Sequence, residues 1–260
     1  MTQADPWAAL RGLRIGCVKY LNSRPLICAY DGKVEFGHPS ALAGMLAAGE
    51  LDAALVPVFE VLRDPRYLIV DDAAVACDGP VFSVFLAYHG DIRNVRSVAT
   101  DPASLSSLNL LKVLLAEFHG ICPAFGEQGE ALLLIGNQAI EFRLAEDATR
   151  EGWKFLDLGE EWKRCTGLPF VFAVWAIRPG IPAPSAVADA LREVKARGVA
   201  RIPELIATED FADSETRTRY LTQHLRFEIG TEGKKAIGRF RALLMDRELI
   251  AQPGAPLKFI

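Results

Sequence analysis

The stretch SALAGMLAAGELDAALVPV, residues 40–58, decides the fold class of this sequence. Its first ten residues have the apolar spacing of a helix, and Gly49 stands where that helix should end, because glycine adopts the left-handed C-cap conformation without strain. The apolar run from Ala53 to Val58 is short and continuous, which is typical of a strand buried on both faces. A helix followed at once by such a strand predicts an α/β fold with a parallel sheet.

The same alternation continues on both sides of this stretch. LRIGCV (13–18) precedes it as another short apolar run, and a second α/β block begins near Val95. Within that block a helix is predicted to begin near Ser104 to Ser107 and to end at Gly120, because serine favours helix starts and glycine favours helix ends.

The last third of the chain changes character. FVFAVWAI (170–177) is too short to cross a membrane and is rich in aromatic and β-branched residues, so it predicts a buried strand. After Pro184 the apolar residues recur at intervals of three and four, which predicts helices throughout this part of the chain.

Two α/β blocks predict two lobes joined by the runs Val81 to Tyr88 and Phe170 to Ile177. We expect residues 1–90 together with 174–260 to form the first lobe, which includes the C-terminal helices, and residues 91–173 to form the second. A ligand is expected between the lobes, because α/β sheets bind at the carboxyl ends of their strands and pockets favour domain interfaces.

Composition narrows the function classes. The chain has 260 residues, a net charge of -4 and no cluster of Lys and Arg, which argues against a nucleic acid as partner. No segment has the length or apolarity of a membrane span, and MTQADPWAALRG lacks the pattern of a secretory signal, so a cytoplasmic location is expected.

The five cysteines are odd in number and scattered, which predicts reduced thiols. His119 and Cys122 have ligand-like spacing without a second pair, so no metal is expected.

Four turns at predicted strand ends carry many hydrogen-bonding groups. They are Tyr20 to Ser23, Pro57 to Glu60, Ser104 to Ser107, and Gly136 with Asn137. Serine hydroxyls and the free N–H groups of helix N-termini bind carboxylates well, so a small carboxylate is the expected ligand. Helix capping alone is the simpler explanation for each single turn. Because the chain is acidic, selectivity for an anion has to come from these local donors and from Lys19 or Arg24.

Conventional catalytic signatures are absent. The sequence has no GxGxxG or GxxxxGK[ST] phosphate loop, no HExxH and no GxSxG, and no histidine stands in a nucleophile–base arrangement. His89 follows a predicted strand and could line the cleft, although a structural role at a hinge is favoured. The residues taken by themselves predict a two-lobed binder of a small carboxylate.

Several motifs taken together resemble the chorismate dehydratase family of the futalosine route to menaquinone. They are VKYLNSRPL, GELDAALVPVFEVLR, CDGPVFSV, ATDPASLSSLNLLKVLL, ALLLIGNQAI and LDLGEEWKRCTGLPFVFAVWAIR. The resemblance implies a fold like that of type II periplasmic binding proteins. It also implies dehydration of chorismate to 3-[(1-carboxyvinyl)oxy]benzoate without a cofactor.

The resemblance also assigns site residues. Asn22 and Ser83 are expected to contact the substrate close to the chemistry. The expected substrate-binding residues are Tyr20, Ser23, Pro57, Ser104, Ser106, Ser107 and Asn137. Chorismate is then the small-molecule partner, and the sequence does not predict the oligomeric state.

The sequence departs from the family pattern at two positions. Leu105 stands where the family often has Arg, and Asn137 where it often has Asp, which could be a compensated pair or a change of ligand. Two alternatives stay open at this point. One is the related 1,4-dihydroxy-6-naphthoate synthase, which resembles a chain with an SPCPND-type turn where this sequence has KYLNSRP. The other is a non-catalytic carboxylate-binding protein of the same fold.

Overall fold

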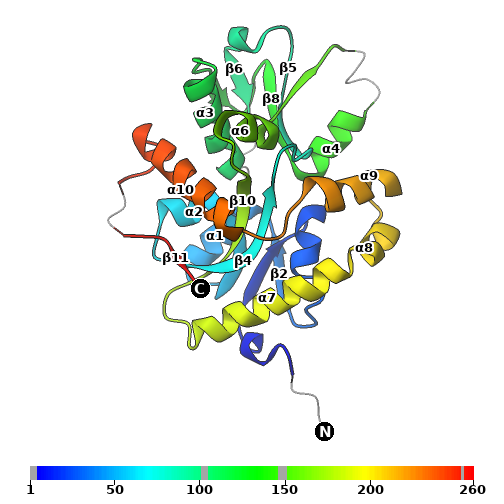
Figure 1. Ribbon diagram of the computed structural model, residues 1–260, viewed down its shortest axis with the longest axis vertical. Coiled ribbons are helices and arrows are strands. Elements are labelled where there is room, and N and C mark those ends of the chain that lie inside the picture. Colours follow the sequence, from blue (N-terminus) through cyan, green and yellow to red (C-terminus); the bar gives the residue numbers. More distant parts are fainter. Residues whose placement is uncertain (1–4, 101–104, 146–150, 253–254) are drawn as a thin grey trace.

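The computed structural model describes residues 5–100, 105–145, 151–252 and 255–260, and these form two lobes, each built on its own sheet (Figure 1). The first sheet has six strands in the order β11-β4-β10-β3-β1-β2. Its strands are β1 (Ile15–Val18), β2 (Val34–Gly37), β3 (Ala53–Pro57), β4 (Leu68–Cys77), β10 (Phe170–Ile177) and β11 (Lys258–Phe259). β1 is parallel to both β2 and β3, as the opening stretch predicts, whereas β10 runs antiparallel to β3 and β4.

The second sheet has five strands in the order β7-β6-β8-β5-β9. Its strands are β5 (Val84–Tyr88), β6 (Ser97–Ala99), β7 (Ala124–Gly126), β8 (Ala131–Ile135) and β9 (Lys154–Asp157). β6 is parallel to its neighbours β7 and β8, and β5 is antiparallel to β8 and β9. The α/β class and the two-lobed architecture predicted from the sequence are confirmed.

Helices cover both sheets. In the first half of the chain they are η1 (Ala8–Leu10), η2 (Leu21–Leu26), α1 (Pro39–Ala47), α2 (Val58–Arg63), η3 (Ile92–Asn94) and α3 (Leu105–Phe118). In the second half they are α4 (Gly136–Leu144), α6 (Leu158–Thr166), α7 (Pro184–Ala200), α8 (Ile202–Thr208), α9 (Ser214–Arg219), η4 (Tyr220–His224) and α10 (Gly230–Asp246).

The punctuation predicted for two helices is confirmed. α1 is followed by Gly49 at φ 75°, and α3 is followed by Gly120 at φ 68°. Both glycines take the left-handed conformation that side chains with a Cβ rarely adopt, so each ends its helix where the sequence indicates.

The buried strand predicted at 170–177 is β10, which lies at the centre of the first sheet with Trp175 and Phe170 in its core. The prediction that the chain is helical throughout after Pro184 is wrong at the end. Residues Lys258 and Phe259 form β11, which pairs in parallel with β4. A two-residue edge strand has no periodicity of its own, so only its pairing partner defines it.

The chain crosses between the sheets twice, through residues 78–83 and 167–169. Of the two runs expected to join the lobes, Val81 to Tyr88 forms β5 of the second sheet, and Phe170 to Ile177 forms β10 of the first. The crossing at residues 78–83 comes just before β5, and the crossing at residues 167–169 comes just before β10. The expected division at residues 90 and 173 stays a prediction.

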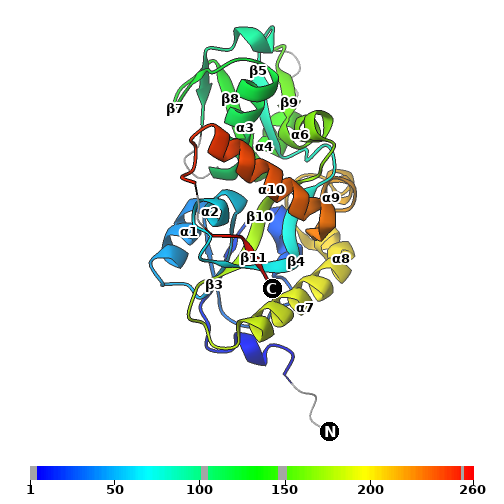
Figure 2. The same cartoon turned by 60° about the vertical axis from the view of Figure 1, so that its left-hand side comes forward.

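The C-terminal helices bind the two lobes to each other and to the first sheet. α10 packs against β10 of the first sheet and α3 of the second, and it crosses the molecule diagonally between the lobes (Figure 2). α7 lies along the first sheet and packs against η2 and β4. Within the described ranges, no helix combines the length and apolarity needed to span a bilayer.

Candidate active site

A cavity of about 610 Å³, measured with its open mouth, lies between the two lobes. The enclosed part of it is narrow, with about 70 Å³ for the centres of water-sized molecules. Its walls come from the carboxyl ends of β1 and β3, the start of β5, the first turn of α3, and the junction of β8 with α4. The ligand position predicted from the sequence, between the lobes and at strand ends, therefore holds a cavity.

Among the described residues, the polar side chains of this wall are all uncharged. They are Tyr20, Asn22, Ser83, Ser106 and Ser107. The remaining lining residues are apolar or glycine: Val18, Pro39, Leu55, Val56, Pro57, Val75, Val81, Val84, Leu105, Ile135, Gly136, Phe172 and Ala173. A site of this kind binds a ligand by shape and by directed donors rather than by ion pairs.

The turn after β1 contributes Tyr20 and Asn22. Tyr20 is the extended N-cap residue of η2, at ψ 153°, and no side-chain cap hydrogen bond is made there. The polar residues of this turn therefore do not serve as a local helix cap. Asn22, one residue into η2, faces the cavity instead.

Ser83 forms the closed floor of the cavity at the start of β5. Its side chain has no exposed surface, and its Oγ accepts a hydrogen bond of 2.7 Å from the hydroxyl of Tyr220. The Asn22 side chain also lies close enough to that hydroxyl to lower the pKa of Tyr220. Tyr220 is thus the group through which Asn22 and Ser83 are connected.

Burial raises the pKa of Tyr220, although the hydrogen bond with Ser83 and the proximity of Asn22 oppose this shift. The phenol therefore stays protonated at neutral pH and acts as a donor to Ser83.

The start of α3 places Ser106 and Ser107 on the opposite wall. Both are buried, and Ser106 Oγ accepts a hydrogen bond of 3.1 Å from the backbone N–H of Phe59. Phe59 lies in the first turn of α2, which has no side-chain cap of its own. A serine of one lobe therefore caps a helix of the other.

The junction of β8 with α4 repeats this arrangement. Asn137 Oδ1 accepts a long hydrogen bond of 3.4 Å from the backbone N–H of Leu21, the first residue of η2. Gly136 has φ 64°, and a Cβ atom there would meet the Tyr20 ring at 3.3 Å. Glycine is therefore required where the tyrosine of one lobe packs on the backbone of the other.

Most of the residues predicted from sequence line the cavity, but two of those that the structure describes do not. Asn137 faces Leu21 rather than the cavity. Ser23 is fully buried, and its hydroxyl lies 2.7 Å from the carbonyl oxygens of Val18 and Tyr20. Ser104 lies outside the described residues. The roles assigned to all these residues stay predictions.

The cations expected to add selectivity are not on the wall. Arg24 forms an ion pair of 2.6 Å with Glu209, and neither Arg24 nor Lys19 lines the cavity. Across the described ranges of the chain, no charged side chain lines the cavity. A carboxylate bound there would meet hydroxyl, amide and backbone donors.

The histidines noted in the sequence are engaged elsewhere. His119 Nε2 lies 2.7 Å from Glu161, and His89 is exposed and stacks on Trp153. Within the part of the chain that the structure describes, no group of three or more His, Cys, Asp or Glu side chains could hold a metal ion.

Sequence reasoning missed Tyr220 and Asp157. Tyr220 lies in a stretch whose spacing indicates only a packing helix. Asp157 is buried, and its carboxylate accepts hydrogen bonds from the backbone N–H groups of Val81 and Phe82 at 3.0 and 2.7 Å. No sequence signal pointed to either role, because both act on residues more than 70 positions away.

Solved structures with the same fold define the class. A crystal structure of a protein from Archaeoglobus fulgidus has a TM-score of 0.72 at 18% identity and covers 92% of this chain and 98% of its own. A Candida albicans protein described as having the generic periplasmic binding protein fold has a TM-score of 0.61 at 14% identity, covering 93% and 91%. The chain is therefore a two-lobed α/β protein of the periplasmic-binding-protein-like class.

Sequence comparison narrows this class to one family. The family model described as menaquinone biosynthesis matches residues 13–246. A chorismate dehydratase from Thermus thermophilus is 33% identical over 224 residues, which is 77% of this chain and 82% of that protein. The chain belongs to this menaquinone biosynthesis family.

Proposed function

We propose that this protein is a chorismate dehydratase, a carbon–oxygen lyase that eliminates water from chorismate to give 3-[(1-carboxyvinyl)oxy]benzoate without a cofactor. One observation carries the proposal: Asn22 and Ser83 meet around one buried hydroxyl at the cavity wall. Membership of the menaquinone biosynthesis family and the identity to a chorismate dehydratase support it.

The neutral donors of the cavity suit the two carboxylates of chorismate. Ser106 and Ser107 stand in the first turn of α3, where free N–H groups and the helix dipole favour an anion. Tyr20 lies on the opposite wall. We assign one carboxylate to the α3 turn and the other to the side of the cavity near Tyr20.

The elimination does not require a strong acid or a strong base from the protein. The C–H bond at the ether-bearing ring carbon breaks, its electron pair forms a ring double bond, and the neighbouring C–O bond breaks. The proton and the expelled hydroxide leave as one water molecule, and the ring becomes aromatic. The gain of aromaticity drives the step, so positioning and charge stabilisation are the main tasks of the site.

The proton acceptor in this proposal is the enolpyruvyl carboxylate of the substrate itself. Within the described residues, no histidine, lysine or carboxylate lines the cavity. Asn22 is assigned the role of orienting the substrate and stabilising the charge that develops during elimination. Contact with Ser83 requires the lobes to part slightly, because its side chain has no exposed surface here, and two-lobed folds make hinge motions of this kind.

The direct test incubates purified protein with chorismate and follows the enolpyruvyl benzoate by chromatography with mass detection. Turnover by the wild-type protein, reduced about 100-fold or more in Asn22→Ala, is the expected result. Asn94→Ala is the matched control, since Asn94 is exposed in η3, and it should react at the wild-type rate.

Three results would count against parts of the proposal. Binding of chorismate without product would make the protein a carboxylate receptor. Full turnover by Asn22→Ala would remove Asn22 from the mechanism. A chorismate analogue without the enolpyruvyl carboxylate that still eliminated water at the normal rate would exclude substrate-assisted proton removal.

A further inference from the structure

Tyr220 begins the π-helical turn η4, which follows directly on α9. π-helical turns inside helical segments are rare and are frequent at functional sites. Only 1% of the Tyr220 surface is exposed, yet its hydroxyl reaches Ser83 at the floor of the cavity. A residue 137 positions away in sequence therefore completes the surroundings of Ser83.

The hydrogen bond from Tyr220 limits the directions open to the Ser83 proton. A serine hydroxyl has one proton and two acceptor lone pairs, and it rotates freely unless a neighbour holds it. Tyr220 donates to Ser83 Oγ at 2.7 Å and occupies one lone pair. Among the residues that the structure describes, none accepts the proton of Ser83, so this proton is available to a ligand in the cavity.

The backbone just before Ser83 is also held by hydrogen bonds. Phe82, the preceding residue, has φ 68°, a left-handed conformation that is strained for a residue with a side chain. The Asp157 carboxylate holds the Val81 and Phe82 N–H groups in place. The turn before Ser83 is thus strained and locked by hydrogen bonds from the second lobe.

The π-helical turn η4 makes two further contacts with residues 80–83. His224 lies at the end of η4, and its Nδ1 is 3.0 Å from the Pro80 carbonyl oxygen. Its ring stacks on Phe82, with centroids 5.2 Å apart and planes at 14°. One short turn therefore contacts the crossing segment at Pro80, Phe82 and Ser83, the last of these through Tyr220.

We propose that Tyr220 is a positioning residue for the elimination, acting through Ser83. Its hydroxyl donates to Ser83 Oγ and so aims the Ser83 proton at the hydroxyl group that leaves the substrate. This inference rests on the proposed function of the same cavity. Tyr220 gains and loses no proton in the reaction, because Ser83 supplies a hydrogen bond and the water is made from substrate atoms alone.

The physical gain comes from order and polarisation. A hydroxyl held by a donor does not have to reorient when negative charge develops on the leaving oxygen. Accepting a hydrogen bond also polarises the Ser83 O–H group and makes it a stronger donor. Both effects act in the transition state, so they raise kcat more than they change substrate binding.

The test is Tyr220→Phe, which removes one oxygen atom and leaves the buried ring in place. We expect kcat for chorismate to fall about 10- to 100-fold, with KM within about 3-fold of wild type. In the double variant Tyr220→Phe/Ser83→Ala, kcat should match that of Ser83→Ala alone, because the effect inferred for the tyrosine passes through the serine. Tyr67→Phe is the matched control, since Tyr67 is also buried and its hydroxyl accepts a hydrogen bond from Arg66 away from the cavity.

The outcomes are separable. If wild-type protein makes no product, the proposed function and this inference both fall. If wild type turns over and Tyr220→Phe keeps the wild-type kcat, only the inference falls. A loss in Tyr220→Phe that simply adds to the loss in Ser83→Ala would mean that Tyr220 acts through another group, such as Asn22, or through the fold, and would also overturn the inference.

A second variant keeps the test decisive if Tyr220→Phe folds poorly. Incorporation of 3-fluorotyrosine at position 220 keeps the size and the donor but makes the hydroxyl more acidic. We expect kcat to change by about 2-fold or more while KM and the melting temperature stay at their wild-type values. An unchanged kcat in a folded protein would overturn the inference.

Discussion

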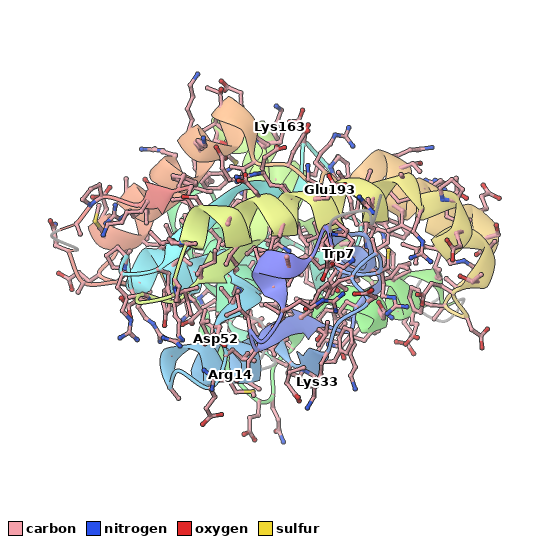
Figure 3. The ribbon with its side chains drawn as sticks, turned by 90° about the horizontal axis from the view of Figure 1, so that it is seen from below. Trp7, Arg14, Lys33, Asp52, Lys163 and Glu193 are labelled. Carbon is pink, nitrogen blue, oxygen red and sulfur yellow. The ribbon has the colours of Figure 1, made fainter. Side chains whose placement is uncertain are left out.

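Two polar clusters, each centred on a buried side chain, lie at opposite ends of the first sheet, and they differ in charge and in what they face. At one end, Asp52 binds Arg14 at 2.9 Å and Arg178 at 2.7 Å. At the other end, Ser83 and Asn22 share the hydroxyl of Tyr220. Each cluster joins three segments far apart in the sequence, but only the second lies at the cavity. Seen from below, Arg14 and Asp52 lie together under the sheet (Figure 3).

The difference shows what distinguishes a structural cluster from a site. Both oxygens of Asp52 are occupied, since Oδ2 also accepts the Arg14 backbone N–H at 2.8 Å, so nothing is left for a ligand. The neutral cluster leaves the Ser83 proton without a described acceptor, and its Asn22 follows the carboxyl end of β1, the kind of position where α/β proteins bind. We therefore expect charge at the first end to stabilise the fold, and we propose that the uncommitted donors at the second end take part in the chemistry.

The largest expected effect removes the uncommitted donor. Ser83→Ala should lower kcat/KM for chorismate by about 100- to 1,000-fold, because a donor that acts in the transition state is lost. Steady-state kinetics would measure this, with Ser185→Ala, an exposed serine on α7, as the control. If kcat/KM of Ser83→Ala stayed within about 3-fold of wild type, the Ser83 cluster would have no more role in catalysis than the Asp52 cluster.

The next largest effect is expected at the Asp52 cluster, where a substitution should change stability and leave activity unchanged. Asp52→Asn should lower the free energy of unfolding by about 2–3 kcal/mol and leave kcat per folded molecule unchanged, because two arginines lose their buried partner. Urea unfolding at pH 7 combined with kinetics would measure both. A loss of kcat without a loss of stability would contradict the structural role.

The pH dependence of this stabilisation follows from the Asp52 carboxyl. The hydrogen bond from Arg14 comes first in holding the pKa of Asp52 well below its ordinary value of 3.8, and Arg178 adds to it. A lowered pKa means that the stabilisation is present above pH 3.8 and is lost as the pH falls through the lower folded value. The stability difference between wild type and Asp52→Asn should therefore shrink below pH 3.8, which unfolding curves at pH 7 and pH 3 would compare.

A smaller effect tests the contact between the lobes at α3. Ser106→Ala removes the acceptor of the Phe59 N–H and one predicted donor for a carboxylate. We expect KM for chorismate to rise about 10-fold with little change in kcat, since the lost interaction is made equally in substrate and transition state. Ser185→Ala again serves as the control, and an unchanged KM would show that Ser106 only caps α2.

The smallest effect concerns Asn137, one of the two positions that depart from the family pattern. Asn137→Ala removes the acceptor of the Leu21 N–H, a long hydrogen bond of 3.4 Å, so KM should rise only about 3-fold. Asn137→Asp keeps an acceptor oxygen and should behave like wild type. A large effect of Asn137→Asp would instead mean that charge at this position decides which ligand is bound.

The cavity wall was predicted unevenly from the sequence. Asn22, Ser83 and Ser106 were singled out, because each lies in a motif or a strand-end turn. The sequence does not predict that Ser106 pairs with Phe59 or that Tyr220 pairs with Ser83, because these partners come from other parts of the chain. Capping was the simpler explanation for these turns, yet the first turns of η2 and α2 have no side-chain caps of their own and receive Asn137 and Ser106 from the other lobe.

The sequence by itself determined the elements, because periodicity, helix punctuation and apolar runs are local properties of neighbouring residues. The helix ending before Gly49, the strand β3 after it and the buried strand β10 were all legible in this way. Only the tertiary structure decided that Tyr220 reaches Ser83, that Asp157 locks the turn before it, and that Ser23 points away from the cavity. The first two contacts join residues that are far apart in the sequence, and the third sets the direction of a side chain. All three depend on tertiary packing, which produces no periodic pattern in the sequence.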